Sequence, residues 1–343
     1  MNVSRDLLQR LPKTDLHVHL DGSLRPETLI ALAREYHQPL PTDDPASLRE
    51  HMYVRDARDL VDYLTRFDIT LNVLQTADAL DRVAYELAED AARENVRYME
   101  VRYSPVLNTR EGLTLHEVVE ASLRGLSRAA KDFGIRTNVV ICALRQMSPQ
   151  TSVELAHVAA DFKDRGVVAF DLAGPEYDHP PKKHAEAFRV AAHANLGITV
   201  HAGEAFGAAS IRQALHDCGA DRIGHGTRLY EDAELMRYVN DFRIPLEVCL
   251  TSNVQTRVVD SLATHPAKRY LDDGLVITLN SDNRLMSGTT VTDEFAHAHE
   301  HLGFGWAQLT AIARMGFESA FLPWPEKRKM LETVDREIAR LVG

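Results

Sequence analysis

Two periodicities alternate along the chain from Thr14 onward. Short runs rich in β-branched residues are typical of buried strands, and the longer segments between them repeat apolar residues at helical spacing. Alternation of this kind predicts repeated strand–helix units around a parallel sheet. The predicted strands are 14–20, 97–103, 137–143, 167–172, 199–201, 222–225, 245–249 and 276–280.

Helix signals occupy the intervals between these strands. Pro26 is a typical first-turn residue, and the segments that follow it are amphipathic or end near helix-breaking residues. The predicted helices are 27–35, 115–132, 152–165 and 208–218. Eight strands, each followed by a helix, predict an α/β chain of the (β/α)8 TIM barrel class.

The length of the chain exceeds what a bare barrel needs. A (β/α)8 barrel takes about 250 residues, and this chain has 343. We expect the surplus in a helical insertion at 26–94, after the first strand, and in extra C-terminal helices at 292–343. No linker-like tract interrupts the pattern, so 1–343 is predicted to be one domain, with 26–94 as a possible lid.

A doubly wound open sheet is the competing fold. Such folds usually hold phosphate on a glycine-rich loop after the first strand. Neither G-x-G-x-x-G nor G-x-x-x-x-G-K-[ST] follows 14–20, which favours the barrel.

Composition and charge exclude several classes of protein. Hydrophobic residues make up 45% of the chain, enough for a substantial core, and the net charge of −11 from 39 basic and 50 acidic residues disfavours nucleic acid and anionic membranes as partners. We find neither a bilayer-spanning apolar segment nor a signal peptide. The three cysteines, Cys142, Cys218 and Cys249, are widely spaced and odd in number, which predicts reduced thiols in a cytoplasmic protein.

Candidate chemistry begins on the first strand. Polar and apolar residues alternate in D-L-H-V-H-L-D at 15–21, so His17 and His19 share one face near the C-terminal end of the strand. Two imidazoles on one face can bind one metal ion. A strand that carries histidines and binds nothing is the ordinary alternative for this pair alone.

Other strands end in similar residues. His201 and Glu204 follow the fifth strand, His225 closes the sixth, and Asp282 and Asn283 follow the eighth. Each residue alone also fits an ordinary role, such as a helix cap or a solvated carboxylate. Active sites of barrels lie at the C-terminal ends of the strands, so together these residues predict a single site at the mouth.

The motifs T-D-L-H-V-H-L-D-G-S, H-A-G-E, R-I-G-H-G and L-N-S-D-N, in this order and spacing, resemble the adenosine deaminase family of the amidohydrolase superfamily. M-E-V-R-Y-S-P at 99–105 and D-L-A-G at 171–174 are also similar, so the resemblance covers nearly the whole chain. It implies one Zn²⁺ per chain, with an open position for water. The implied metal ligands are His17, His19, His201 and Asp282.

The activity implied by the resemblance is hydrolytic deamination of a 6-aminopurine nucleoside in purine salvage, with adenosine and 2′-deoxyadenosine as the leading substrates. Zinc lowers the pKa of its bound water and so supplies hydroxide near neutral pH. Asp282 and His225 would orient that water and accept or share its proton. Glu204 would protonate purine N1, for which it must itself be protonated, and burial favours that state.

Four residues are expected to bind the substrate by the same resemblance. The backbone N–H of Gly174 would meet purine N3, and His19 would contact the substrate as well. Asp21 would meet the ribose 5′-hydroxyl and repel a 5′-phosphate, which favours nucleosides over nucleotides. Asn283 stands where many members carry a second aspartate, and its amide can donate to N7 at any pH.

Two features receive open interpretations. Apolar residues of the insertion either cover the nucleoside as a lid or simply pack between helices; they are Met52, Tyr53, Leu60, Tyr63, Leu64 and Phe67. Glu247, apparently inward on the seventh strand, is either a partner of the catalytic acid or a buried, paired carboxylate.

Other functions fit the sequence less well. Cytidine-type deaminases need a C-x-x-C, which is missing, and two-metal barrel hydrolases normally carry a lysine on the fourth strand, where 167–172 has none. A secreted relative that kept the barrel only for binding or signalling would have lost metal-ligand residues. Within the family, 6-aminodeoxyfutalosine or adenine are the alternative substrates. The expected partner is a small-molecule purine nucleoside, bound by a monomer or weak homo-oligomer.

Overall fold

In the computed structural model, which describes residues 3–55 and 57–342, eight parallel strands are hydrogen-bonded in chain order. Each lies within two residues of its predicted bounds, so all eight predicted strands are confirmed. The strands are β1 (Lys13–His19), β2 (Val96–Tyr103), β3 (Arg136–Leu144), β4 (Val167–Ala173), β5 (Gly197–Ala202), β6 (Arg222–His225), β7 (Leu246–Val248) and β8 (Ile277–Leu279).

The sheet closes between its first and last strands. The backbone N–H of His19 donates to the carbonyl of Asp282 over 2.7 Å, and the N–H of Asp282 donates to the carbonyl of His17 over 2.8 Å. Val18 and Asp282 form an isolated parallel bridge. The predicted (β/α)8 TIM barrel is therefore confirmed.

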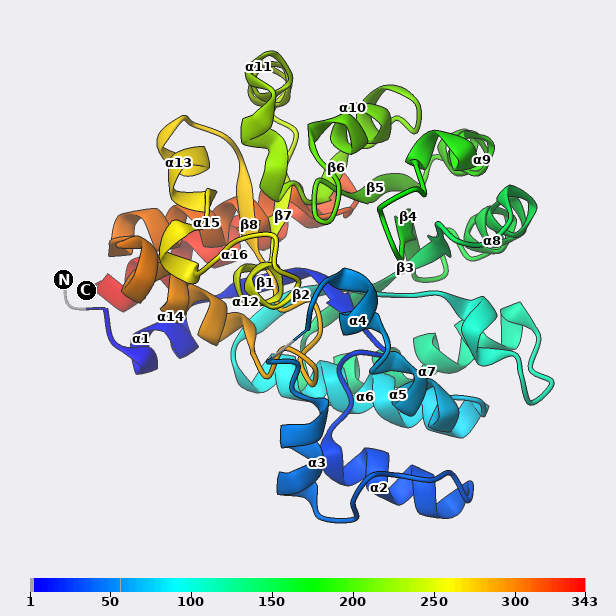
Figure 1. The fold of residues 1–343 in the computed structure, drawn as a ribbon. Helices are drawn as coiled ribbons and strands as arrows, with labels where there is room; N and C mark the ends of the chain where they lie inside the picture. Colours follow the sequence, from blue (N-terminus) through cyan, green and yellow to red (C-terminus); the bar gives the residue numbers. More distant parts are fainter. Residues whose placement is uncertain (1–2, 56, 343) are drawn as a thin grey trace.

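Helices surround the barrel (Figure 1). The longest helix between β2 and β8 is α7. It begins at a capping box formed by Thr114 and Glu117 and ends at Gly134, which adopts the left-handed conformation. The elements between β2 and β8 are η1 (Pro105–Asn108), α7 (Leu115–Phe133), α8 (Pro149–Asp161), η2 (Pro181–His184), α9 (Ala185–His193), α10 (Ala208–His216), η3 (Thr227–Glu231), α11 (Ala233–Asp241), α12 (Leu250–Gln255), η4 (Leu262–Thr264) and α13 (Ala267–Asp272).

The prediction of a helix over 152–165 is wrong at both ends. Helix α8 begins at Pro149, because the Ser148 side chain accepts the N–H of Thr151 and Pro149 suits the first turn. It ends at Asp161, before Asp164 and Gly166 adopt φ values of +64° and +117°. Such left-handed residues cannot continue a right-handed helix.

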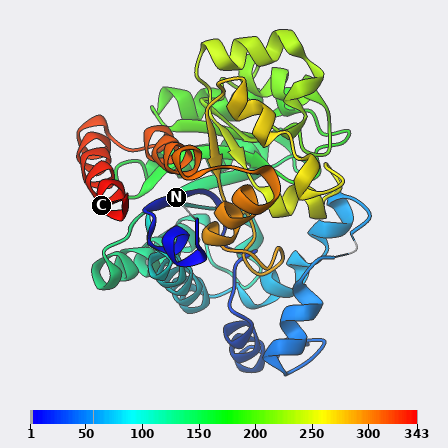
Figure 2. The same ribbon diagram turned by 90° about the vertical axis from the view of Figure 1, so that its left-hand side faces the viewer.

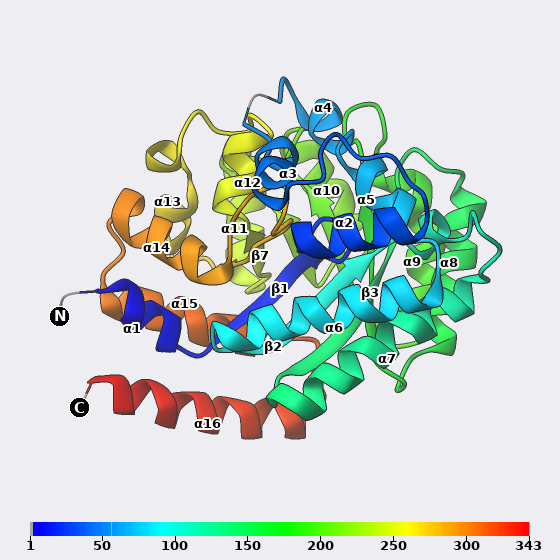
Figure 3. The same ribbon diagram turned by 90° about the horizontal axis from the view of Figure 1, so that it is seen from below.

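The insertion and the C-terminal segment are helical, as predicted. Helices α2 and α3 stand away from the barrel (Figure 2). In Figure 3, α4 lies at one end of the barrel, and α1 and α16 lie at the other with both chain termini. Gly343, the last residue of the predicted tail, lies outside the described residues. The bounds are α1 (Arg5–Arg10), α2 (Pro26–Glu35), α3 (Pro45–Met52), α4 (Leu60–Leu64), α5 (Phe67–Val73), α6 (Ala77–Arg93), α14 (Val291–Leu302), α15 (Trp306–Ser319) and α16 (Trp324–Val342).

Among the described residues, no helix has the length and apolar character needed to cross a bilayer. Cys142, Cys218 and Cys249 are buried and free, as predicted.

Candidate active site

A cavity of about 220 Å³ opens at the C-terminal mouth of the barrel. Eight of the nine residues expected in the site line it, and they come from β1, β4, β5, β6, β8 and the loops that follow. They are His19, Asp21, Gly174, His201, Glu204, His225, Asp282 and Asn283. The ninth, His17, is fully buried on β1 with its Nε2 within 3.6 Å of Asp282 Oδ1. The fold thus brings residues that are far apart in the chain to one point.

Four of these side chains direct donor atoms at a common centre. His19 Nε2 lies 3.2 Å from His201 Nε2 and 3.4 Å from Asp282 Oδ1. His17, His19 and His201 offer ring nitrogens that all lie within 4.8 Å of one another. His17 Nε2 is buried without a hydrogen-bond partner in the described part of the chain. A buried, unpaired imidazole nitrogen beside two others and a carboxylate fits a catalytic zinc site.

The other ring nitrogens of two of these histidines are held by carboxylates. His17 Nδ1 lies 2.9 Å from Glu247 Oε2, and His201 Nδ1 lies 2.9 Å from Asp171 Oδ2. Arg102 bridges the two carboxylates: its Nη1 lies 2.9 Å from Asp171 Oδ2, and its Nη2 lies 2.9 Å from Glu247 Oε2. Carboxylates in this position fix the tautomer and orientation of a metal-binding histidine.

This arrangement decides between the two interpretations of Glu247. It is a buried, paired carboxylate, and its partners are His17, Arg102 and Arg222 rather than the expected acid Glu204. The roles of Asp171 and Arg102 were not predicted, although both lie in motifs that carry the family resemblance.

Electrostatics keep two of the histidines neutral. Burial, reinforced by Arg102 and the neighbouring imidazoles, lowers the pKa of His17 and His19 well below the ordinary value. Although burial opposes it, the interaction with His201 and Arg102 holds the pKa of Asp171 far below that of a free carboxyl. Neutral imidazoles with free lone pairs are the form that binds a metal.

Glu204 follows β5 through a tight turn. Gly203 adopts φ +71°, a left-handed conformation that favours glycine. The Glu176 carboxylate accepts the backbone N–H groups of Gly203 at 2.7 Å and Glu204 at 3.0 Å. Glu204 is therefore on an ordered loop, and no sequence signal had indicated Glu176 as its support.

The Glu204 carboxyl is buried beside His225, with Glu204 Oε2 3.6 Å from His225 Nε2. Burial raises the pKa of Glu204 to about 8, and the nearby Asp282 carboxylate adds to the effect. The carboxyl therefore carries a proton at neutral pH, as the predicted acid requires.

Two residues of the site have strained backbones. His225 has φ +62° and Asp282 has φ +56°. For residues with a Cβ this region costs about 1–2 kcal/mol each. Strain of this kind persists where the surroundings enforce it and gathers at functional sites.

The insertion covers the mouth with α4 and α5. The predicted lid residues that line the cavity are Leu60, Tyr63, Leu64 and Phe67. Met52 and Tyr53 do not line it: Met52 is buried at the end of α3, and Tyr53 lies against Gly288. The Tyr63 hydroxyl lies 3.1 Å from Ser287 Oγ, which ties this cover to the loop after β8.

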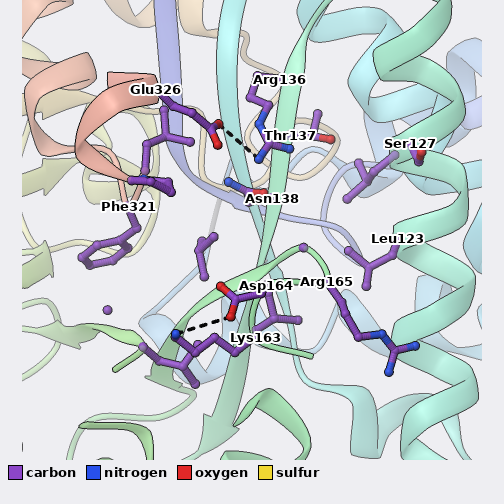
Figure 4. Close-up of a pocket in the computed structure, with 18 of the residues that line it drawn as sticks. Leu123, Ser127, Arg136, Thr137, Asn138, Lys163, Asp164, Arg165, Phe321 and Glu326 are labelled. Carbon is purple, nitrogen blue, oxygen red and sulfur yellow. Dashed lines mark ion pairs between the residues drawn. The ribbon is translucent and has the colours of Figure 1, made fainter. Parts of the chain in front are cut away.

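A larger cavity of about 730 Å³ lies at the opposite end of the strands, near the starts of β3, β4 and β5. Its charged groups are already paired (Figure 4): Arg136 lies 3.5 Å from Glu326, and Lys163 lies 3.6 Å from Asp164. It holds none of the residues expected in the site. Size alone therefore does not identify the reactive cavity.

The sequence matches a known family over most of its length. The adenosine deaminase family model matches residues 12–337. The chain is 39% identical over 333 residues to an adenosine deaminase of Clostridium kluyveri, which covers 97% of this chain and 95% of that protein.

Solved structures share the fold. An amidohydrolase from Burkholderia ambifaria with bound zinc superposes with a TM-score of 0.92 at 26% identity, covering 100% of this chain and 95% of that one. The adenine deaminase of Arthrobacter aurescens superposes with a TM-score of 0.86 at 30% identity, covering 97% of this chain and 99% of that one.

Proposed function

The chain belongs to the adenosine deaminase family, and on this premise we propose that its barrel-mouth site hydrolyses adenosine to inosine and ammonia through the nine residues described above. The chain is a hydrolytic deaminase. One observation supports the detailed assignment above all others: donor atoms of His17, His19 and Asp282 converge beside the buried, protonated carboxyl of Glu204. A metal-ligand set and an acid in one cavity suit addition of water to a purine ring.

His17, His19, His201 and Asp282 would hold one zinc ion. When bound, zinc lowers the pKa of water and so supplies a nucleophile at neutral pH. The donor set of three nitrogens and one carboxylate supports this metal, as does the zinc in the Burkholderia ambifaria amidohydrolase.

The protons of the reaction have defined carriers among the residues of this chain. As water oxygen bonds to the amine-bearing carbon, Glu204 gives its proton to N1, and the water proton passes to Asp282 or His225. That group then protonates the departing amine. Ammonia leaves, the new hydroxyl returns a proton to Glu204, and the site is restored.

We assign recognition of the purine to the backbone N–H of Gly174 and to the side-chain amide of Asn283. Gly174 has φ +97°, a conformation that favours glycine, and the missing Cβ would let the purine approach so that the Gly174 N–H meets N3. Asn283 lines the same cavity and would donate from its amide to N7. His19 lines the cavity and would also contact the purine. The cover formed by α4 and α5 would exclude water from the bound nucleoside.

The pH dependence of kcat/KM tests the acid role of Glu204. Because burial raises the pKa of Glu204 to about 8, the carboxyl keeps its proton at neutral pH and loses it as the pH rises. A bound cation lowers that pKa, so we expect kcat/KM for adenosine to fall on the alkaline side with a midpoint at or below about pH 8. Initial rates from about pH 6 to about pH 10 measure this limb. Rates that stay level or increase up to about pH 10 would exclude the assignment.

Asp21→Ala tests recognition of the sugar. Asp21 lines the cavity, and its Oδ1 has no hydrogen-bond partner among the described residues, so this oxygen is free to accept the 5′-hydroxyl. Losing this hydrogen bond costs about 1–3 kcal/mol, so kcat/KM for adenosine should fall about 5- to 100-fold. The preference for adenosine over adenosine 5′-monophosphate should fall with it.

The matched control for this variant is 5′-deoxyadenosine, which lacks the hydroxyl. Its kcat/KM should be nearly the same in Asp21→Ala and in the parent protein. An equal loss for both nucleosides would show that Asp21 acts on the fold of the loop and not on the sugar.

The activity itself is measured by the ultraviolet absorbance change of zinc-loaded protein with adenosine, beside a chelator-stripped sample. Adenine and 6-aminodeoxyfutalosine are run in parallel, because a structural neighbour is an adenine deaminase. Zinc-dependent turnover of adenosine is the expected result. If only adenine or only 6-aminodeoxyfutalosine were turned over, the proposed hydrolytic deamination would stand, but that compound and not adenosine would be the substrate.

The cysteines indicate the compartment of the protein. Three buried, free cysteines fit a reducing compartment, and we place the protein in the cytoplasm. We further propose that it works as a single catalytic domain, monomeric or weakly self-associated, whose insertion 26–94 opens and closes over the nucleoside.

A further inference from the structure

A chain of buried hydrogen bonds runs from His225 away from the cavity. Asn253 Nδ2 lies 3.1 Å from His225 Nδ1. On its other side, Asn253 Oδ1 lies 2.9 Å from Thr227 Oγ1 and 3.1 Å from His265 Nε2. His265 Nδ1 accepts the backbone N–H of Ala267 over 3.1 Å. The four side chains are at most 3% exposed, so water does not compete for these bonds.

The contact between His265 and Ala267, at the end far from the cavity, fixes which group donates in each of these hydrogen bonds. A backbone N–H can only donate, so His265 Nδ1 must present a lone pair to Ala267. Burial lowers the pKa of His265 to about 3, so the ring is neutral at the pH of the reaction. A neutral ring with a free Nδ1 carries its proton on Nε2. His265 therefore donates to Asn253 Oδ1.

The orientation of the Asn253 amide follows from this. Its Oδ1 receives the His265 Nε2–H and the Thr227 hydroxyl, and a rotation of the amide by 180° would turn its NH2 group toward the His265 donor. The NH2 group must therefore face His225. It donates to His225 Nδ1, which must present its own lone pair.

We propose, resting on the proposed function, that Asn253 and His265 are positioning residues that fix His225 with its proton on Nε2, so that His225 serves as a hydrogen-bond donor and not as the base. His225 Nε2 is the nitrogen on the cavity side, 3.6 Å from Glu204 Oε2. A nitrogen that already carries a proton cannot take one from water. The water proton therefore goes to the Asp282 carboxylate, which returns it to the departing amine.

The two ring nitrogens of His225 therefore have different roles, because Nδ1 accepts from the Asn253 amide and Nε2 carries the proton. The Nε2–H lies on the cavity side, where it would donate to the attacking oxygen as negative charge develops during addition of water. A fixed donor in that position stabilises the transition state.

The direct test is the tautomer of His225 in the zinc-loaded protein. Proteins labelled with 15N-histidine give long-range 1H–15N correlation spectra that distinguish a protonated ring nitrogen from one with a lone pair. A His225→Gln variant identifies the signals. We expect the proton of His225 on Nε2. A spectrum with the proton on Nδ1 would overturn the inference, even if the substrate proved to be another amine.

An Asn253→Asp variant tests whether turnover depends on the tautomer of His225. The carboxylate has the same shape and still accepts from Thr227 and His265, but toward His225 it can only accept, which moves the ring proton to Nδ1. Placing the wrong tautomer beside the reacting atoms should lower kcat by about 10²- to 10⁴-fold with a much smaller change in KM.

Two comparisons keep this test specific. Asn240→Asp on α11, the same exchange at a solvent-exposed amide outside the cavity, should leave kcat and the His225 signals unchanged. If Asn253→Asp fails to fold, the spectrum of the parent protein still decides. An Asn253→Asp protein that moves the proton to Nδ1 and yet keeps kcat within about threefold would contradict the donor role.

Discussion

His19→Ala and Asp282→Ala proteins should bind no zinc and lose deamination of adenosine together. Each removes a donor atom from a centre where His19 Nε2 and Asp282 Oδ1 lie 3.4 Å apart. Removing one donor weakens binding of the ion and alters its coordination, and the activated water disappears with the ion. We expect kcat/KM to fall by at least about 10⁴-fold, and zinc content measured by atomic absorption to fall in parallel.

The protein offers a matched control for this experiment. His297, Glu300 and His301 on α14 form another group that could hold a metal, but it is partly or fully exposed and none of its residues lines the cavity. A His297→Ala/His301→Ala protein should keep both zinc and activity. If that protein lost the zinc and His19→Ala retained it, the metal would belong on α14.

Glu204→Gln should separate metal binding from turnover. Glutamine keeps the size of the side chain but has no proton to give to purine N1, so zinc content should be unchanged while kcat falls by about 10²- to 10⁴-fold. The residual rate should also lack the alkaline limb expected of the parent protein. Zinc analysis and a pH series on the same preparation measure both effects.

Glu154→Gln, on the exposed face of α8, is the matched control for loss of a carboxyl. It should be indistinguishable from the parent protein in zinc content and in kcat. A fully active Glu204→Gln protein would refute the acid assignment, and one that lost zinc would show that Glu204 supports the metal site instead.

Local patterns predicted the fold well because each strand carries its own signal. The β-branched runs end within one residue of the strand ends, and the alternation at 15–21 alone places His17 and His19 on one face. The error at 152–165 arose from the helix boundary, where Ser148 and Pro149 start the helix earlier and Gly166 closes the turn that follows it.

Partnerships across the barrel could not be predicted in the same way. Whether Glu247 meets His17 or Glu204 depends on the register between strands far apart in the chain, which no local pattern encodes. The same holds for the bond between Asp171 and His201, and for the Asn253 amide behind His225. The lid was only partly predicted, because an apolar stripe does not reveal which side chains face a cavity and which, like Met52, pack inward.

The closure of the barrel links the metal to the folding of the whole chain. The first and last strands meet through residues such as Leu16 and Asn280, which are 264 positions apart. His17 and His19 stand on one side of this junction and Asp282 on the other, so the ligand set does not exist until the most distant parts of the chain have met. An ion bound there would crosslink the two ends of the sheet. Such a link would add its binding free energy to the native state alone, so the same ion that would activate water would also stabilise the closed barrel.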